Sequence, residues 1–154
     1  MPSLLPLNRE SVEARLLDLG NAVAELDQLA ATPQADFVTN AHTVALASYY
    51  LQRAIEDILG IGTHLLARLP TPVTVEEYRD VVPELARAGI VSTAFATRNA
   101  KLGSYRNRLV HHYLDVTPEE IYRILTEHRT DLVAFGRSIR AVLEDSAAFN
   151  FTID

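Results

Sequence analysis

Apolar residues recur along most of the chain at the three- and four-residue spacing of a helix that packs one face against a core. The first stripe steps by four, three, four and three positions and consists of Val12, Leu16, Leu19, Val23 and Leu26. It predicts an amphipathic helix that ends at the break Thr32-Pro33-Gln34. A longer stripe predicts a second helix from about residue 39 to residue 68, with inward positions Val44, Leu51, Ile55, Ile58, Leu65 and Leu69. Gly60 and Gly62 lie inside this second helix and indicate close packing or a kink.

Turn and capping residues divide the middle of the chain. The segment Leu69-Pro70-Thr71-Pro72 ends the second helix. Residues 74–77, Thr-Val-Glu-Glu, match a capping box and predict that a short third helix opens there. Pro83 is expected to kink or split this helix, and Gly89 to close it. A fourth helix is expected from about Ser92 into the arginine- and histidine-rich segment that follows.

The last helix has the clearest start signal in the chain. Thr117 is expected to be its N-cap, Pro118 its first helical residue and Glu120 the acid of a capping box. Its apolar stripe consists of Ile121, Leu125, Leu132, Phe135, Ile139 and Val142. No segment has the pattern of a strand or hairpin. The pattern predicts an all-α fold, an antiparallel up-and-down bundle of four long helices plus one short helix. A single domain is expected over residues 1–154, with a core of about 10–145 and short tails at both ends.

Composition narrows the class of protein. A chain of 154 residues with 48% hydrophobic residues is expected to fold around a sizeable core. It contains no cysteine, which excludes disulfides and thiolate chemistry. No apolar run approaches the roughly 18 residues of a membrane span. Residues 1–9 lack the charged and apolar regions of a signal peptide. These features predict a cytoplasmic protein without a membrane partner.

Charge is unevenly distributed. The formal net charge of −6 argues against non-specific nucleic-acid binding by the whole surface. Between Leu85 and Leu114, however, there is no Asp or Glu. The basic residues of this window are Arg87, Arg98, Lys101, Arg106 and Arg108. The window suits phosphate contacts. The alternative interpretation is a solvated basic helix face that pairs with acidic neighbours.

The basic window ends in the segment Arg106-Asn107-Arg108-Leu109-Val110-His111-His112-Tyr113. It combines a permanent cation, an amide, a titratable imidazole and a phenol. Such groups hold a phosphate, transfer a proton near neutral pH and stabilise developing negative charge, as cleavage of an RNA backbone requires. The alternative is a set of ordinary polar residues at a helix end. No metal-ligand spacing, P-loop or dinucleotide-binding motif is present, so neither a metal nor a cofactor is expected.

The arrangement R-x4-H-x-Y from Arg106 to Tyr113 resembles the signature of HepT toxins, a branch of the HEPN (higher eukaryotes and prokaryotes nucleotide-binding) superfamily. The resemblance extends to residues 50–59 and 119–122 and covers roughly residues 10–145. It implies a HEPN-like fold and a metal-independent endoribonuclease toxin that acts on RNA, either tRNA or mRNA. It also implies a homodimer and a cognate minimal nucleotidyltransferase as antitoxin.

The resemblance implies roles for the residues of the motif. His111 would act as general base or acid, and Arg106 would hold the scissile phosphate. Asn107 would orient the motif, while Arg108 and Tyr113 would support the site or bind substrate. The products would be a 2′,3′-cyclic phosphate or 3′-phosphate and a 5′-hydroxyl. Tyr113 would also receive AMP from the antitoxin. The neighbouring His112 leaves open which imidazole does the chemistry.

Helix geometry constrains this site. Arg106 and Tyr113 are seven residues apart, so on one helix they share a face about 10 Å apart along the axis. His111 points roughly 140° away from Arg106. A straight helix therefore cannot gather all three side chains. Either the helix ends near Leu109–His112, or a second subunit completes the site.

Two other functional classes remain as alternatives. One is a non-catalytic HEPN module that binds nucleotides or serves as the partner subunit of a nucleotidyltransferase. The other is a purely structural helical dimer. The intact Arg106–His111 pair favours the enzyme over both. Among lesser candidates, Glu56-Asp57 either approaches the motif and tunes His111 or forms a solvated helix face, and His128 is expected to be a satisfied core or interface histidine.

Overall fold

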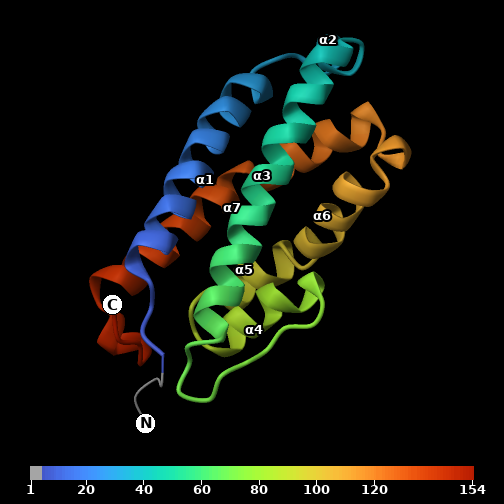
Figure 1. Ribbon diagram of the computed structural model, residues 1–154. Coiled ribbons are helices and arrows are strands. Elements are labelled where there is room, and N and C mark those ends of the chain that lie inside the picture. Colours follow the sequence, from blue (N-terminus) through green and yellow to red (C-terminus); the bar gives the residue numbers. More distant parts are fainter. Residues whose placement is uncertain (1–4) are drawn as a thin grey trace.

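The computed structural model describes residues 5–154, and the first residues of the expected N-terminal tail, 1–4, lie outside the described residues. The longer helices are α1 (Arg9–Ala30), α3 (Ala41–Leu66), α6 (Leu102–His111) and α7 (Pro118–Glu144). The short helices are α2 (Gln34–Val38), α4 (Val81–Arg87) and α5 (Thr93–Arg98). Single turns of 3₁₀ helix are η1 (Tyr78–Asp80), η2 (Tyr113–Asp115) and η3 (Ser146–Phe149). Helices α1, α3 and α7 pack against one another, and α6 packs against α3 beside them (Figure 1). The predicted all-α helical bundle is confirmed.

Side-chain caps fix where the long helices begin. The Asn8 Oδ1 accepts from the backbone N–H of Ser11 at the start of α1, and Asn40 caps α3 in the same way. Thr117 caps α7 by accepting from the Glu120 N–H, and Pro118 is the first helical residue, both as predicted. The predicted capping box is incomplete, because the Glu120 carboxylate pairs with an arginine of α6 instead.

Helix α3 runs without interruption past both of its C-terminal glycines. A Cβ added at Gly62 would lie 2.5 Å from Val81 Cγ1 of α4, and one added at Gly60 would lie 2.6 Å from Arg15 Cζ of α1. Such distances are closer than van der Waals contact, so both glycines mark close packing rather than a kink. Each lets a neighbouring side chain approach the backbone of α3.

The third helix begins later than the sequence predicts. Residues 74–77 do not form its first turn; η1 starts at Tyr78 and α4 at Val81. Pro83 lies in the first turn of α4, where a missing N–H removes no hydrogen bond, and therefore does not kink the helix. Gly89 closes the helix with φ of 75°, as predicted.

The expected fourth helix is divided in two. Helix α5 ends at Arg98 and α6 begins at Leu102, so the single helix predicted from Ser92 is wrong. The break occurs at Asn99, which is fully buried. Its Nδ2 donates to the Phe95 carbonyl at 2.9 Å, and its Oδ1 accepts from His128 Nδ1 at 2.9 Å. An asparagine side chain that satisfies a carbonyl of the helix competes with the helical backbone pattern and favours a helix end.

The C-terminal residues pack against the body of the bundle rather than forming a tail outside its core. Phe151 is buried. The Leu7 N–H donates to the Thr152 carbonyl at 2.7 Å, and the Asp154 N–H donates to the Leu7 carbonyl at 2.8 Å. This contact holds the two ends of the described chain together (Figure 1). Leu7 and Ile153 form an isolated β-bridge, and residues 5–154 contain no β-sheet. No described helix is long and apolar enough to cross a membrane.

Candidate functional site

The motif lies on α6 and on the turn that follows it. His111 is the last residue of α6, His112 is its C-cap with φ of −134° and ψ of 34°, and Tyr113 begins η2. The helix therefore ends within the motif, as one of the two predicted geometries requires. The His112 N–H donates to the Arg108 carbonyl at 2.8 Å, which closes the last turn of α6.

Arg106 is held on the side of α6 that faces α3. Its side chain is 19% exposed, and its Nε lies 3.5 Å from Glu56 Oε1. Its guanidinium carbon lies 4.5 Å from the centroid of the Tyr78 ring, a cation–π contact. The Asn107 Oδ1 accepts from Arg106 Nη1 at 3.4 Å. Glu56 thus approaches the motif, but it contacts Arg106 rather than His111.

The titratable end of the motif is free. His111, His112 and Tyr113 are all exposed, Tyr113 to 65%. In the described part of the chain, no side chain forms a hydrogen bond with the His111 imidazole, and no hydrogen bond, ion pair or ring contact joins Arg106 to His111 or Tyr113. One copy of the chain therefore brings Arg106, Asn107 and Glu56 together and leaves His111 apart from them. The imidazole is available to a substrate or to a second copy.

Arg108 ties α6 to α7. Its two terminal nitrogens meet the two carboxylate oxygens of Glu120, with 2.9 Å between Nη2 and Oε2. This bidentate pair holds the pKa of Glu120 below its usual range. Arg108 Nη2 also donates to the Asp115 carbonyl at 3.5 Å. The arginine predicted to support the site or bind substrate thus fixes both ends of the turn that carries Tyr113.

The arginines of the basic window are paired with acidic side chains from outside the window. Each of its arginines pairs with a carboxylate, and the pairs are Arg87–Glu84, Arg98–Asp131, Arg106–Glu56 and Arg108–Glu120. Lys101 forms no ion pair within residues 5–154. The alternative interpretation, a basic face paired with acidic neighbours, therefore describes the isolated chain. Phosphate would have to compete with these carboxylates for the arginines.

An apolar groove of about 880 Å³ lies beside the exposed end of the motif. It runs between the N-terminal half of α3 and the segment from the end of α6 to the start of α7. Its walls include Tyr49, Val110, Tyr113 and Leu114, and Leu114 is 85% exposed. Exposed apolar surface of this kind is typical of a protein interface.

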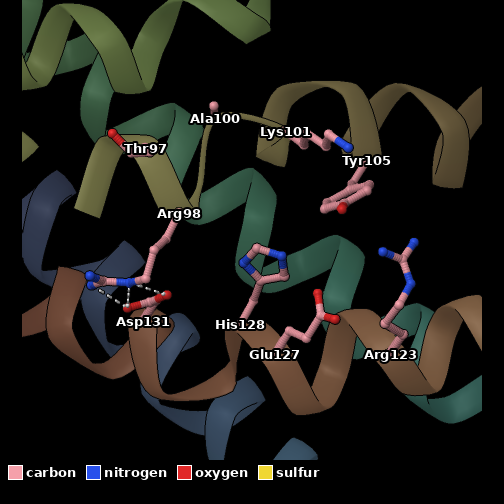
Figure 2. A pocket seen from close by; sticks show the side chains of 9 residues that line it. All are labelled: Thr97, Arg98, Ala100, Lys101, Tyr105, Arg123, Glu127, His128 and Asp131. Carbon is pink, nitrogen blue, oxygen red and sulfur yellow. Dashed lines mark hydrogen bonds and ion pairs between the residues drawn. The ribbon is translucent and has the colours of Figure 1, made fainter. Parts of the chain in front are cut away.

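A second, polar pocket of about 390 Å³ lies between α5, α6 and α7. Figure 2 shows Arg98 reaching Asp131, with 2.8 Å between Nη2 and Oδ1, and the His128 imidazole near the centre. The Tyr105 ring meets His128 edge-on at 5.6 Å. Burial lowers the pKa of His128. The interpretation of His128 as a satisfied core histidine is confirmed.

The sequence does not predict two contacts of the motif. Tyr78 covers Arg106, and Glu120 binds Arg108. Neither has a local sequence signal, because each depends on the packing of a separate element against α6. Residues 5–154 contain no group of three or more His, Cys, Asp or Glu side chains placed to hold a metal ion.

Comparison with known proteins places this arrangement in a family. The ribonuclease HepT-like family matches residues 19–139. A curated relative, the tRNA nuclease HepT of Aphanizomenon flos-aquae (strain 2012/KM1/D3), is 22% identical over 132 residues, which cover 86% of this chain and 89% of the relative.

Solved structures share the fold. The cytosolic protein of unknown function YutE from Bacillus subtilis superposes with a TM-score of 0.79 at 24% identity, covering 92% of this chain and 95% of YutE. The tri-AMPylated HEPN toxin of Shewanella oneidensis, in complex with MNT antitoxin, superposes with a TM-score of 0.74 at 18% identity, covering 84% of this chain and 96% of the toxin. Because the family match spans most of the described helices, from α1 to α7, the chain belongs to the ribonuclease HepT-like family.

Proposed function

We propose that this protein is a metal-independent endoribonuclease and the toxin of a toxin–antitoxin pair. The observation that carries the proposal is the contrast within the motif between a held arginine and a free histidine. Arg106 is largely buried against the Tyr78 ring and has only a long contact to Glu56, while the His111 imidazole stands exposed at the end of α6. A preorganised cation and an accessible imidazole are what backbone cleavage of RNA requires. The family match and the name of the curated relative support RNA, and in particular tRNA, as substrate.

In this mechanism His111 takes the proton from a ribose 2′-hydroxyl. The 2′-oxygen then attacks the adjacent phosphorus, and the bond from phosphorus to the 5′-oxygen breaks. Arg106 binds the phosphate and stabilises the charge that develops on it. A second imidazole, the His111 of another copy, protonates the departing 5′-oxygen. The products are a 2′,3′-cyclic phosphate and a 5′-hydroxyl.

The proposal includes a homodimer with both motifs near its two-fold axis. One copy leaves His111 apart from Arg106, so a second copy is needed to complete the site. The apolar groove beside His111 provides surface for such a contact, because Leu114 and Tyr113 project there with most of their area exposed.

The test is cleavage of purified tRNA in the presence of EDTA. We expect the wild-type protein to cut, and His111→Ala to lower the rate by about 100-fold or more. The matched control is His112→Ala, which removes a neighbouring exposed imidazole and should retain activity. Both variants should melt within a few degrees of the wild type, since neither ring is in the core. Loss of cutting in His112→Ala alone would assign the chemistry to the other histidine, and cutting that stops with EDTA would refute the metal-independent mechanism.

Tyr113 is the proposed target of the antitoxin. Its phenol begins η2 and is 65% exposed, so a nucleotidyltransferase has access to it. The phenol oxygen would attack the α-phosphorus of ATP, releasing pyrophosphate and the phenol proton. The bound AMP would place an anion and a bulky adenosine beside the exposed motif and block RNA. The AMP-modified toxin among the structural relatives supports this proposal.

Co-expression with the cognate nucleotidyltransferase tests the modification. We expect the intact mass of the wild-type protein to increase by one or more AMP units, with the first on Tyr113. Tyr113→Phe should lose that adduct, whereas Tyr49→Phe, which removes another exposed phenol of the same groove, should keep it. A toxin that is inhibited but unmodified would show that the antitoxin acts by binding alone.

A further inference from the structure

Gly60 has no side chain, and this lets Arg15 of α1 pass the backbone of α3 and reach the cavity that holds Arg106. The guanidinium of Arg15 lies across the backbone of Gly60, where an added Cβ would be 2.6 Å from Arg15 Cζ and 2.7 Å from Nη1. Any side chain at Gly60 would occupy that path. Arg15 and Arg106 consequently line the same cavity of about 240 Å³, together with Glu56 and Tyr78.

Both guanidinium groups of this cavity are weakly paired. Arg15 Nη1 lies 3.5 Å from Asp57 Oδ1, and Arg106 Nε lies 3.5 Å from Glu56 Oε1. Strong charge-assisted hydrogen bonds are shorter, about 2.7–2.9 Å, as in the Arg98–Asp131 pair at 2.8 Å. The Asp57 Oδ2 is buried without a hydrogen-bond partner. The cavity therefore contains two cations whose hydrogen-bonding capacity is largely unused.

The walls of the cavity are fixed while Arg15 remains accessible. Helix α6 approaches η1 so closely that a Cβ at Gly103 would lie 2.5 Å from the carbonyl carbon of Tyr78. This contact sets the Tyr78 ring over Arg106. The Arg15 side chain is 47% exposed, and that of Glu56 is 38% exposed. An incoming anion can thus meet Arg15 directly and displace Glu56 toward solvent.

We propose that Arg15 is a second phosphate-binding residue, and that Arg15 and Arg106 bind one phosphodiester of the RNA backbone between them. This inference rests on the proposed ribonuclease function. Two guanidinium groups that line one cavity favour phosphate, whose oxygens accept several hydrogen bonds at once. The cavity belongs to the proposed RNA-binding site because it contains Arg106, the residue proposed to hold the scissile phosphate. In the protein without RNA, Glu56 is the counter-ion that the phosphodiester replaces.

The experiment measures RNA binding without cleavage. The parent protein carries His111→Ala, and its affinity for a tRNA is measured by fluorescence anisotropy over a series of salt concentrations. We expect Arg15→Gln to weaken binding by about tenfold and to reduce the salt slope of log K by about 0.7. Gly60→Ala should have a similar effect on affinity, since it displaces the guanidinium without removing its charge. The matched control is Arg53→Gln, which removes an arginine that bridges the same two helices through Asp18.

A variant of Glu56 tests whether this carboxylate is displaced from Arg106 when phosphate binds or instead holds Arg106 in place for RNA. Glu56→Gln should tighten RNA binding several-fold, because phosphate no longer competes with a carboxylate for Arg106. Weaker RNA binding in Glu56→Gln would contradict the proposed replacement of Glu56 by phosphate.

The Arg15→Gln substitution also removes the partner of Asp57, so the unfolding of this variant is measured in parallel. If that variant does not fold, Gly60→Ala decides the matter.

The outcomes distinguish this inference from the function on which it rests. A parent protein that binds RNA, with affinity and salt slope unchanged in Arg15→Gln and Gly60→Ala, overturns the role of Arg15 and leaves the ribonuclease proposal standing. A parent protein that does not bind RNA at any salt concentration overturns both. Equal losses of RNA affinity in Arg15→Gln and in the Arg53→Gln control would mean that only the net charge of the protein matters. That result would also refute a specific phosphate site at Arg15.

Discussion

Arg106 and Arg108 stand two residues apart on α6, yet they have different surroundings. Arg106 lies over Tyr78 with a long contact to Glu56, so phosphate can compete for it. Arg108 is bound at both terminal nitrogens by Glu120 and positions the turn after α6. The sequence identifies both as basic residues of one motif. It does not distinguish them, because their partners come from elements that meet α6 only in the folded chain.

Asp57 is expected to make the stability of the protein depend on pH. Burial raises its pKa from about 4 to about 6, against the attraction of Arg15 and Arg53 and with a small contribution from Glu56. A carboxyl whose pKa is raised on folding binds its proton more tightly in the folded state. Its contribution to stability therefore falls as the pH rises from about 4 to about 6 and stays low above that window.

The check is a comparison of unfolding free energies for wild type and Asp57→Asn in denaturant at pH 4 and pH 7. The amide cannot ionise, so the variant should gain about 2 kcal/mol relative to wild type between these two pH values. The comparison cancels the titration of all other groups that the two proteins share. Parallel pH profiles for the two proteins would show that Asp57 ionises normally in the folded state.

At the scale of elements, the caps of the long helices follow from the sequence, whereas the break between α5 and α6 does not. Thr117 and Pro118 act within a few residues of themselves, so a local pattern identifies the start of α7. Asn99 ends α5 by donating to the Phe95 carbonyl, and its side chain is oriented by a hydrogen bond with His128, which is 29 residues away on α7. No local pattern distinguishes this asparagine from a solvated one. Apolar periodicity alone therefore predicts one continuous helix where the structure has two.

The break makes Asn99 a stability determinant. Asn99→Ala would leave the buried Nδ1–H of His128 without an acceptor and is expected to lower the free energy of unfolding by about 1–3 kcal/mol. Urea unfolding measures the change. The control is Thr97→Ala on the same helix, whose hydroxyl bonds to the Thr93 carbonyl at an exposed position and whose loss should change stability by less than about 0.5 kcal/mol. Equal stability of the two variants would mean that the Asn99–His128 contact does not hold the break.

At the scale of the whole molecule, the helical periodicity determines the fold class, and the C-terminal residues depart from expectation. The stripes of α1, α3 and α7 are long and regular enough to predict a helical bundle. The C-terminal segment is too short to show a helical periodicity. It packs against the bundle because Phe151 enters the core and the backbone of residues 152 and 154 forms hydrogen bonds with Leu7. In the proposed homodimer, His111 meets its substrate only after two copies assemble, and a single sequence does not specify that arrangement.

The proposed homodimer predicts the mass of the protein in solution. Light scattering at micromolar concentration should report twice the mass of the chain, 17.1 kDa. Leu114→Asp places a charge on the exposed groove and should shift the protein to monomer, with loss of RNA cleavage although His111 is intact. Leu17→Asp charges an exposed leucine on α1 and should leave the dimer unchanged. A wild-type protein that remains monomeric would contradict a site shared between two copies.

If His111 and Arg106 cleave RNA by attack of the ribose 2′-hydroxyl, the chemical ends of the cleaved RNA reveal it. The measurement is mass spectrometry of the fragments that the wild-type protein produces from tRNA in EDTA, with His111→Ala as the control. We expect fragments that end in a 2′,3′-cyclic phosphate or a 3′-phosphate and begin with a 5′-hydroxyl, and we expect none above background from the variant. Fragments with a 3′-hydroxyl and a 5′-phosphate would contradict it, because those ends require water rather than the 2′-hydroxyl as the nucleophile.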